Sequence, residues 1–375
     1  MINYATLGSL ITPAKVIRCG NDSFPALSMT MHNGIVMQSE RFKKKLASAD
    51  QSDYKVVKRG QLVVGFPIDE GVLYVQKAAD EGIMSPAYNV WDIDSKVIDP
   101  DFLELCLHSP QSMQYYKNKL RGTTARRRSI PVSDLEALKI RLPDMQTQHE
   151  IVAIIKKAEA IIVDRQEQLD YFEQLVKSRF IELFGDPKYN KSNLVKIGEI
   201  GSLTSGGTPS RAKPEYFEGD IRWYSAGELN SLYLPDSVEH ISKTALQESS
   251  AKLFNKGTLM IGMYDTAAFK LGILTENSSS NQACANLNPQ NDYNVVWLYY
   301  LFDIMKPIFL QKRQGVRQKN LSLSKIKEFE VPNAPIGIQN HFAAFVTQVD
   351  KSKYCSQKFE ELCRELIKIY EQEWM

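Results

Sequence analysis

The chain contains the same segment twice, almost two hundred residues apart. Residues 58–66 read KRGQLVVGF and residues 255–263 read NKGTLMIGM, with glycines and apolar residues at matching places. Further anchors repeat in the same order and with nearly the same shift: Leu7-Gly8 with Ile197-Gly198, Phe102-Leu103 with Val296-Trp297, Ile130 to Ile140 with Leu321 to Val331, and Gln148 with Gln339. A repeat of half the chain's length predicts two copies of one folding unit.

Each copy begins with about 140 residues of mixed character. The runs QLVVGF and TLMIGM are rich in β-formers and follow a glycine, which predicts strands. Residues 100–120 and 294–313 have the apolar spacing of helices. Each copy is therefore expected to begin with an α+β domain.

Each copy ends with a long helix. Residues 148–184 contain neither glycine nor proline, and Gly185-Asp186-Pro187 then predicts a stop. Apolar and long side chains recur at alternating intervals of four and three residues along this segment, which is the spacing of a heptad seam. The seam residues are Ile151, Ile155, Ala158, Ile162, Arg165, Leu169, Phe172, Val176, Arg179 and Leu183. The second copy keeps the seam from Phe342 to Trp374 but places polar residues at Lys353, Ser356 and Glu360, where a local change of register is expected.

Two long helices with matching seams in one chain predict pairing with each other. The expected architecture is α+β: a domain at residues 1–142, a helix at 143–185, a second domain at 186–334 and a second helix at 335–375. We expect the helices to form an antiparallel coiled coil, which gives the chain pseudo-two-fold symmetry.

Composition excludes several classes of protein. The 375 residues are 43% hydrophobic and 24% charged with a formal net charge of +2, so the chain reads as globular and without an overall basic bias. Five dispersed cysteines, none in a C-x-x-C pair, fit a reducing compartment. Residues 1–16 lack the pattern of a signal peptide, and no apolar run is long enough to span a bilayer. We expect a cytoplasmic protein that does not contact a membrane.

Several stretches resemble the specificity subunits of type I restriction–modification systems. LTSGGTPSRAKPEYFEGDIRWYSAGEL at residues 203–229 and SSNQACANL at residues 279–287 resemble parts of a target recognition domain. LPDMQTQHEIVAII, beginning at Leu142, is similar to the start of the family's conserved spacer helix, and VPNAPIGIQNHFAAFV is its second copy. LFGDP at residues 183–187 resembles the exit from the first spacer helix. The resemblance covers the whole chain in the order domain, helix, domain, helix.

The resemblance implies a DNA-reading subunit without catalysis of its own. Each recognition domain would read one half of a bipartite, asymmetric site in double-stranded DNA, and the paired helices would fix the unread spacer. Two methyltransferase subunits and two restriction–translocation subunits would assemble around it. Adenine N6-methylation and cleavage would belong to those partners, together with S-adenosylmethionine, ATP and Mg²⁺, and this chain would bind no cofactor.

Local clusters of basic residues are the candidate DNA contacts, because Lys and Arg bind phosphates and read base edges. A glycine-centred basic loop recurs at the same place in both copies, KLRGTTARRRS from Lys119 and QKRQGVRQKN from Gln311. The candidates in the first domain are Arg41, Lys43, Lys44, Arg121, Arg126, Arg127 and Arg128. Those in the second domain are Arg211, Lys213, Tyr224, Tyr264, Lys270, Lys312, Arg313, Arg317 and Lys319. Trp223 is expected in the core.

Two other functions remain open from the residues alone. A DNA-modifying enzyme is one, because DPKY at residues 186–189 is similar to the D/N-P-P-Y/F motif of amino-methyltransferases. The second proline of that motif is missing, and there is no G-x-x-x-x-G-K-[ST] loop for ATP. A coiled-coil scaffold that binds proteins is the other. Modification of DNA by the purified chain would favour the enzyme, and indifference to DNA in the presence of its partners would favour the scaffold.

Overall fold

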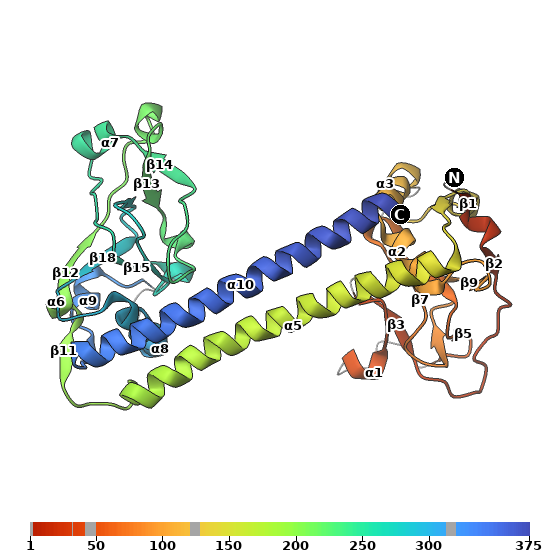
Figure 1. Cartoon of the computed structure of the whole chain (residues 1–375), viewed down its shortest axis with the longest axis horizontal. Coiled ribbons are helices and arrows are strands. Elements are labelled where there is room, and N and C mark those ends of the chain that lie inside the picture. Colours follow the sequence, from red (N-terminus) through yellow and green to blue (C-terminus); the bar gives the residue numbers. More distant parts are fainter. Residues whose placement is uncertain (1–2, 32, 42–49, 121–127, 313–319) are drawn as a thin grey trace. The chain divides into compact units, whose positions relative to one another are not determined.

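The chain folds into two compact units that share two long helices. The computed structural model describes residues 3–31, 33–41, 50–120, 128–312 and 320–375. One unit consists of residues 1–165 and 358–375, and the other of residues 166–357. Each unit holds one domain and parts of both α5 (Met145–Phe184) and α10 (Ile336–Trp374), shown in Figure 1.

The first domain is built on a four-stranded antiparallel sheet in the order β2-β9-β6-β7. Its strands are β2 (Ile11–Pro13), β9 (Asn89–Ile93), β6 (Leu62–Val64) and β7 (Leu73–Val75). Three antiparallel pairs accompany it: β1 (Tyr4–Thr6) with β10 (Lys139–Arg141), β3 (Leu27–Met29) with β4 (Ile35–Met37), and β5 (Lys55–Lys58) with β8 (Glu81–Met84). The helices are α1 (Gln38–Arg41), α2 (Pro100–His108), α3 (Pro110–Lys119) and α4 (Val132–Glu136). Short 3₁₀ turns are η1 (Leu7–Ser9) and η2 (Ile68–Glu70).

The second domain repeats this plan. Its four-stranded sheet has the order β12-β18-β15-β16, with β12 (Gly201–Ser205), β18 (Cys284–Pro289), β15 (Leu259–Gly262) and β16 (Leu271–Ile273). A second sheet has the order β14-β13-β17, with β14 (Glu239–Ile241), β13 (Ile221–Tyr224) and β17 (Ser279–Ser280), and β11 (Leu194–Lys196) pairs with β19 (Glu330–Pro332). The helices are α6 (Ile197–Ile200), α7 (Lys243–Glu248), α8 (Val295–Gln311) and α9 (Leu323–Lys327). Its 3₁₀ turns are η4 (Pro214–Phe217), η5 (Ala226–Glu228) and η6 (Asp265–Ala267).

The repeated segment has the same structure in both domains. Gly60 and Gly257 have φ angles of 86° and 85°, a left-handed conformation that a residue with a Cβ adopts only at a cost. The N–H of Gly60 donates to the carbonyl oxygen of Gln76 at 2.8 Å, and the N–H of Gly257 donates to that of Leu274 at 2.9 Å. The strands that follow, β6 and β15, each lie second from the edge of their sheet. The predicted internal repeat is therefore a structural repeat.

The predicted heptad seam of the first helix is confirmed. All ten positions from Ile151 to Leu183 are buried or half-buried in α5. The helix ends where the sequence predicts, because Gly185 takes a φ of 71° and its N–H donates to the carbonyl oxygen of Ile181 at 2.8 Å. Leu175, the residue before the seam position Val176, is 48% exposed.

In each unit, α5 and α10 run side by side in opposite directions (Figure 1). In the first unit Ala158 and Ile162 of α5 pack with Cys363 of α10. In the second unit the Phe180 and Phe342 rings meet edge to face, with centroids 5.3 Å apart. Residue numbers rise along one helix as those of the contacting residues fall along the other, so the pairing is antiparallel, as predicted.

The polar part of the second seam does not change register. Ser356 stays on the seam, is 6% exposed, and donates a hydrogen bond of 2.9 Å to Oε1 of Gln168 on α5. Burial along α10 continues in steps of four and three through Val349, Ser356 and Cys363. The expected shift is wrong because a hydrogen bond between two polar side chains satisfies the buried hydroxyl where it stands.

Both long helices contribute to the core of each domain or pack against it. In the first unit Ile151 and Ile155 of α5 belong to the core, and Tyr370 and Trp374 of α10 pack against it. In the second unit Phe342 and Val346 of α10 join Val176 and Phe180 of α5 in the core. The two helices thus exchange roles between the units, as pseudo-two-fold symmetry requires. In the described part of the chain, no helix is long and apolar enough to cross a membrane.

This packing predicts a large effect of one substitution. Phe342 is fully buried and contacts Phe180, Phe184 and Tyr300. Replacing it by Ala removes most of a buried ring and leaves a cavity, so we expect the free energy of unfolding to fall by about 3–5 kcal/mol. Tyr171→Ala, at a side chain of α5 that is 66% exposed, is the control and is expected to cost less than about 0.5 kcal/mol. Equal destabilisation of the two variants in urea denaturation would contradict the core assignment.

Candidate nucleic-acid interface

Much of the predicted DNA-binding set lies outside the described residues. These positions are Lys43, Lys44, Arg121, Arg126, Arg127, Arg313, Arg317 and Lys319. Arg41 is the last residue of α1, and only its backbone is described. The structure does describe the residues that flank both basic loops, and these show what each loop is attached to.

In both domains, the described residues that follow the basic loop contact the turn after the repeated strand. In the first domain, the N–H of Ile68 in η2 donates to the carbonyl oxygen of Arg128 at 3.2 Å. In the second, the side-chain oxygen of Asn320 accepts from the N–H of Asp265 in η6 at 3.1 Å, and the N–H of Leu321 donates to the carbonyl oxygen of Met263 at 2.8 Å. The same two segments are therefore held together in each domain.

Arg128 and Lys312 flank the two loops and are already engaged within the protein. The guanidinium of Arg128 lies 3.0 Å from an Asp69 carboxylate oxygen and 2.6 Å from one of Glu70, and its side chain is 30% exposed. The ammonium of Lys312 lies 5.2 Å from the centroid of the Phe329 ring. Arg128 therefore shares its charge with two acids of η2 and holds that turn.

Arg211 and Lys213 of the GGTPSRAKPEYF loop are also paired. The guanidinium of Arg211 makes a two-pronged contact with the Glu239 carboxylate, one arm of which is 2.8 Å, and it lies over the Phe217 ring at 4.2 Å. Hydrogen bonds from Arg211 hold the pKa of the Glu239 carboxyl below its usual value. Lys213 donates to the Tyr216 hydroxyl at 2.6 Å and to Glu248 at 3.1 Å. Both cations brace this loop against β14 and α7.

The loop itself is tightly packed at its glycines. A Cβ on Gly206 would lie 2.2 Å from the carbonyl oxygen of Ser280, and one on Gly207 would lie 2.1 Å from that of Ser250. The indole N–H of Trp223 donates to the carbonyl oxygen of Gly207 at 3.0 Å, and Trp223 is 3% exposed. The prediction that Trp223 belongs to the core is confirmed.

The remaining candidates, Tyr224, Tyr264 and Lys270, differ in whether the side chain lies in the core or on a loop. Tyr224 is 1% exposed and its hydroxyl donates to the carbonyl oxygen of Pro235 at 2.6 Å, which places it in the core and away from a surface that could meet a base. Tyr264 is 40% exposed at the start of the η6 turn. The ammonium of Lys270 donates to the carbonyl oxygen of Gly227 at 3.3 Å, which ties the end of that turn to the η5 segment. Tyr264 and Lys270 thus remain on a loop surface.

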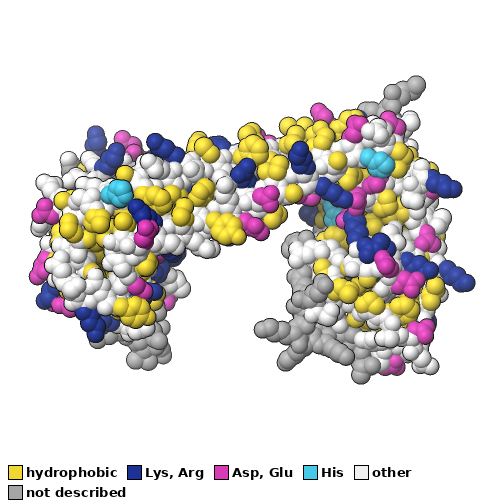
Figure 2. All heavy atoms as spheres, turned by 60° about the horizontal axis from the view of Figure 1, so that its bottom comes forward, with side chains coloured by type: hydrophobic (Ala, Val, Ile, Leu, Met, Phe, Trp, Pro, Cys, Tyr) yellow, Lys and Arg dark blue, Asp and Glu magenta, His cyan; other side chains and the backbone are white. Residues whose placement is uncertain are grey.

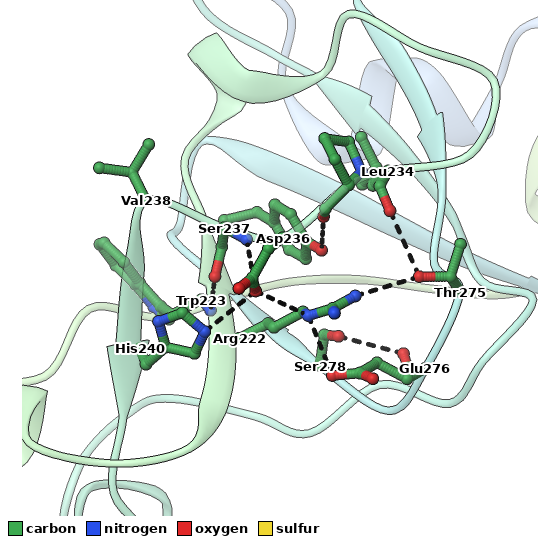
Figure 3. A network of polar contacts seen from close by, with 12 residues as sticks. Arg222, Trp223, Leu234, Asp236, Ser237, Val238, His240, Thr275, Glu276 and Ser278 are labelled. Atoms are coloured by element: carbon green, nitrogen blue, oxygen red, sulfur yellow. Dashed lines mark hydrogen bonds and ion pairs between the residues drawn. The ribbon is translucent and has the colours of Figure 1, made fainter. Parts of the chain in front are cut away.

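The second domain also carries a polar network of residues that were not predicted as site residues, drawn in Figure 3. Arg222 of β13 contacts Asp236 at 2.8 Å, Glu276 at 3.0 Å and the Thr275 hydroxyl at 3.2 Å. His240 of β14 lies 3.0 Å from Asp236. Desolvation would raise the pKa of Asp236, but the hydrogen bond with His240 and the charge of Arg222 outweigh it and lower that pKa. No sequence signal points to this network, because its members come from three separate segments.

Comparison with known proteins adds independent information. Residues 189–362 match the family described as the Type I restriction modification DNA specificity domain. Over 182 residues the chain is 28% identical to the MjaIX type I restriction enzyme specificity subunit of Methanocaldococcus jannaschii, covering 46% of this chain and 42% of that protein. It is 24% identical over 242 residues to the EcoR124I/EcoR124II specificity subunit of Escherichia coli, covering 58% and 57% of the two chains. The matches span about half the length of these relatives.

A solved structure shares the fold. It comes from work on complex assembly and conformational transition of the type I R-M system, and it superposes with a TM-score of 0.62 at 15% identity over 99% of this chain and 97% of that one. At this identity the likeness concerns the fold alone. Residues 189–362 thus form a type I restriction–modification DNA specificity domain, and the resemblance of this chain to the specificity subunits of type I systems is confirmed.

Proposed function

We propose that this chain is the sequence-reading subunit of a type I restriction–modification complex. Each of its two domains would read one half of a bipartite, asymmetric site in double-stranded DNA. The observation that carries the proposal is the structural repeat. The four-stranded sheet, the glycine turn and the attachment of a long helix recur in both domains, whereas the loop residues differ. Two copies of one scaffold with different loops are what two different half-sites require.

The basic loops are the proposed points of contact with the DNA backbone. They recur at the same place in both domains, between α3 and α4 and between α8 and α9. Their arginines and lysines would neutralise phosphates and fix the register of each domain, while polar and aromatic side chains on the neighbouring turns would meet base edges. Among the described residues, Tyr264 and Lys270 occupy such a turn. Arg211 and Lys213 would act by bracing their loop.

The two long helices are the proposed ruler for the spacer between half-sites. Helix α5 has 40 residues and α10 has 39, so each is about 60 Å long at 1.5 Å per residue. Half-sites that are read from one face of B-DNA lie roughly one helical turn apart, or about 34 Å. A continuous helix of this length can span that interval without a flexible linker.

The exposed faces of the helices are the proposed docking surface for the partner subunits. On α10 four apolar side chains repeat in steps of three and four, namely Phe359, Leu362, Leu366 and Ile369, with exposures of 46%, 60%, 39% and 49%. Figure 2 shows apolar side chains gathered along the long helices. Exposed apolar stripes of this kind mark protein interfaces. Two methyltransferase subunits would bind here, and two restriction–translocation subunits would join the full complex.

The chemistry would belong to those partners. They would bind S-adenosylmethionine for adenine N6-methylation, and ATP and Mg²⁺ for translocation and cleavage. In this chain burial raises the pKa of the Cys284 thiol to about 12, so that thiol is protonated at neutral pH and is not a nucleophile. A DNA-reading subunit would act in the cytoplasm, where prokaryotic DNA lies.

Sequence selection in vitro tests this function. The complex of this chain with its methyltransferase partner is mixed with a pool of duplexes that contain a long random segment, and bound duplexes are sequenced. We expect an enriched motif of two fixed blocks separated by a constant number of unread bases. One block alone, or no enrichment with a partner that binds the chain, would contradict the proposal and favour a protein scaffold.

The basic loop of the first domain gives a second test. We expect Arg126→Ala with Arg127→Ala to weaken binding and to reduce the slope of log affinity against log salt by about 1 for each phosphate that the protein no longer neutralises. Arg18→Ala with Arg59→Ala removes the same charge from residues that pair with Asp53 and Asp80, and should leave the slope unchanged. The same change of slope in both double variants would exclude a specific contact by this loop.

A further inference from the structure

One buried glutamine fastens α5 to the first domain. Gln148 is fully buried in the first turns of the helix. Its side-chain oxygen accepts from the N–H of Asp99 at 2.8 Å, and its side-chain nitrogen donates to the carbonyl oxygens of Pro143 at 2.9 Å and Val97 at 3.2 Å. One amide group therefore joins the helix to two other segments, the residues between β10 and the helix and the segment that begins α2.

The second domain has the same arrangement. Gln339 is fully buried in the first turns of α10. Its side-chain oxygen accepts from the N–H of Asn294 at 2.8 Å, and its side-chain nitrogen donates to the carbonyl oxygens of Ala334 at 2.6 Å and Asp292 at 3.4 Å. Each of the three hydrogen bonds of the Gln148 side chain therefore has a counterpart at Gln339.

Each glutamine is bonded to the residue that caps a domain helix. Asp99 and Asn294 are the N-caps of α2 and α8, and their side chains accept from backbone N–H groups of those helices. The residue after each glutamine reaches the same cap: His149 lies 3.5 Å from the Asp99 carboxylate, and the Asn294 amide donates to Asn340 at 2.8 Å. The start of each long helix is therefore tied to the start of a core helix.

This joint resists bending. A buried amide with every bond satisfied is stable, whereas a tilt of the helix would leave a buried donor or acceptor unpaired. The three bonds point to two backbone segments, and two of them tie the helix to the segment that begins α2, so tilting the long helix away from that segment lengthens those two bonds. Each long helix and its domain consequently behave as one rigid piece.

We propose that Gln148 and Gln339 are positioning residues that fix the direction in which each long helix leaves its domain, and that they thereby set the discrimination between spacer lengths. The inference rests on the proposed function. Reading a half-site requires only the loops of one domain, but measuring the distance between half-sites requires a fixed angle at both ends of the helices. The same joint is kept in two domains whose loops differ, which assigns it to the shared task of measuring distance.

The test uses substitutions in the whole complex with its methyltransferase partner. Gln148→Met and Gln339→Met keep the length of the side chain and remove its three bonds. Gln146→Met changes an exposed glutamine two residues away on the same helix and is the matched control. Dissociation constants are measured for the selected site, for sites with the spacer lengthened or shortened by one base pair, and for sites with one base changed within a half-site.

The spacer and half-site measurements separate positioning from a general loss of structure. We expect both joint variants to reduce the preference for the native spacer by about tenfold, the scale of one or two hydrogen bonds, and to keep the effect of a changed base within about twofold of the wild type. Gln146→Met should match the wild type in both. An unchanged spacer preference in the joint variants, or an equal loss of spacer and base discrimination, would overturn the inference.

A measurement on the unmodified chain covers the case in which the variants do not fold. The backbone N–H groups of Asp99 and Asn294 donate to the two glutamines, so a closed joint predicts hydrogen exchange as slow as in the domain cores. Fast exchange at either amide in the wild-type complex would overturn the inference. If the wild-type complex shows no sequence-specific binding, the proposed function fails. Slow exchange at both amides would in that case show a rigid joint that does not set a spacer length.

Discussion

The antiparallel seam between α5 and α10 is the contact on which the rest of the structure depends. In the second unit the core around Trp297 and Phe302 is continued by Val176 and Phe180 of α5, which belong to the first half of the sequence. In the first unit Tyr370 and Trp374 of α10 pack against the core, and the Arg141 guanidinium lies 5.0 Å from the Trp374 ring. Each half of the chain thus completes the core of the other. This explains why the two domains are joined in one chain rather than used separately.

Three cations in the described part of the second domain hold loops in place within the protein. Arg211, Lys213 and Arg222 all contact acids, and each of these ion pairs connects two separate segments of the domain. Ion pairs that are exposed to solvent stabilise a fold only weakly, so the main effect of these pairs is to orient loops. A loop oriented in this way can present other side chains to DNA with less loss of conformational freedom on binding.

The sequence predicts the architecture well because its signals are local or repeated. The heptad seam from Ile151 to Leu183, the glycine stop at Gly185 and the paired glycines Gly60 and Gly257 each depend on neighbours within a few residues. The site is harder to predict because ion pairs depend on tertiary contacts. Glu239, 28 residues from Arg211, carries no pattern that marks it as a partner, and Tyr224 reads as an exposed aromatic until β13 is seen to turn it inward. The polar seam residue Ser356 is a third case, since its partner lies 188 residues away.

The most direct measurement is a base-resolution map of methylated adenines in host DNA after residues 186–334 have been exchanged for the corresponding segment of a relative. If the two domains are separate readers on one scaffold, the host map shows a split motif that depends on this gene. The exchange should then change one block of that motif and leave the other block unchanged. A change in both blocks, or a map that is the same with and without the gene while the methyltransferase is active, would contradict the account.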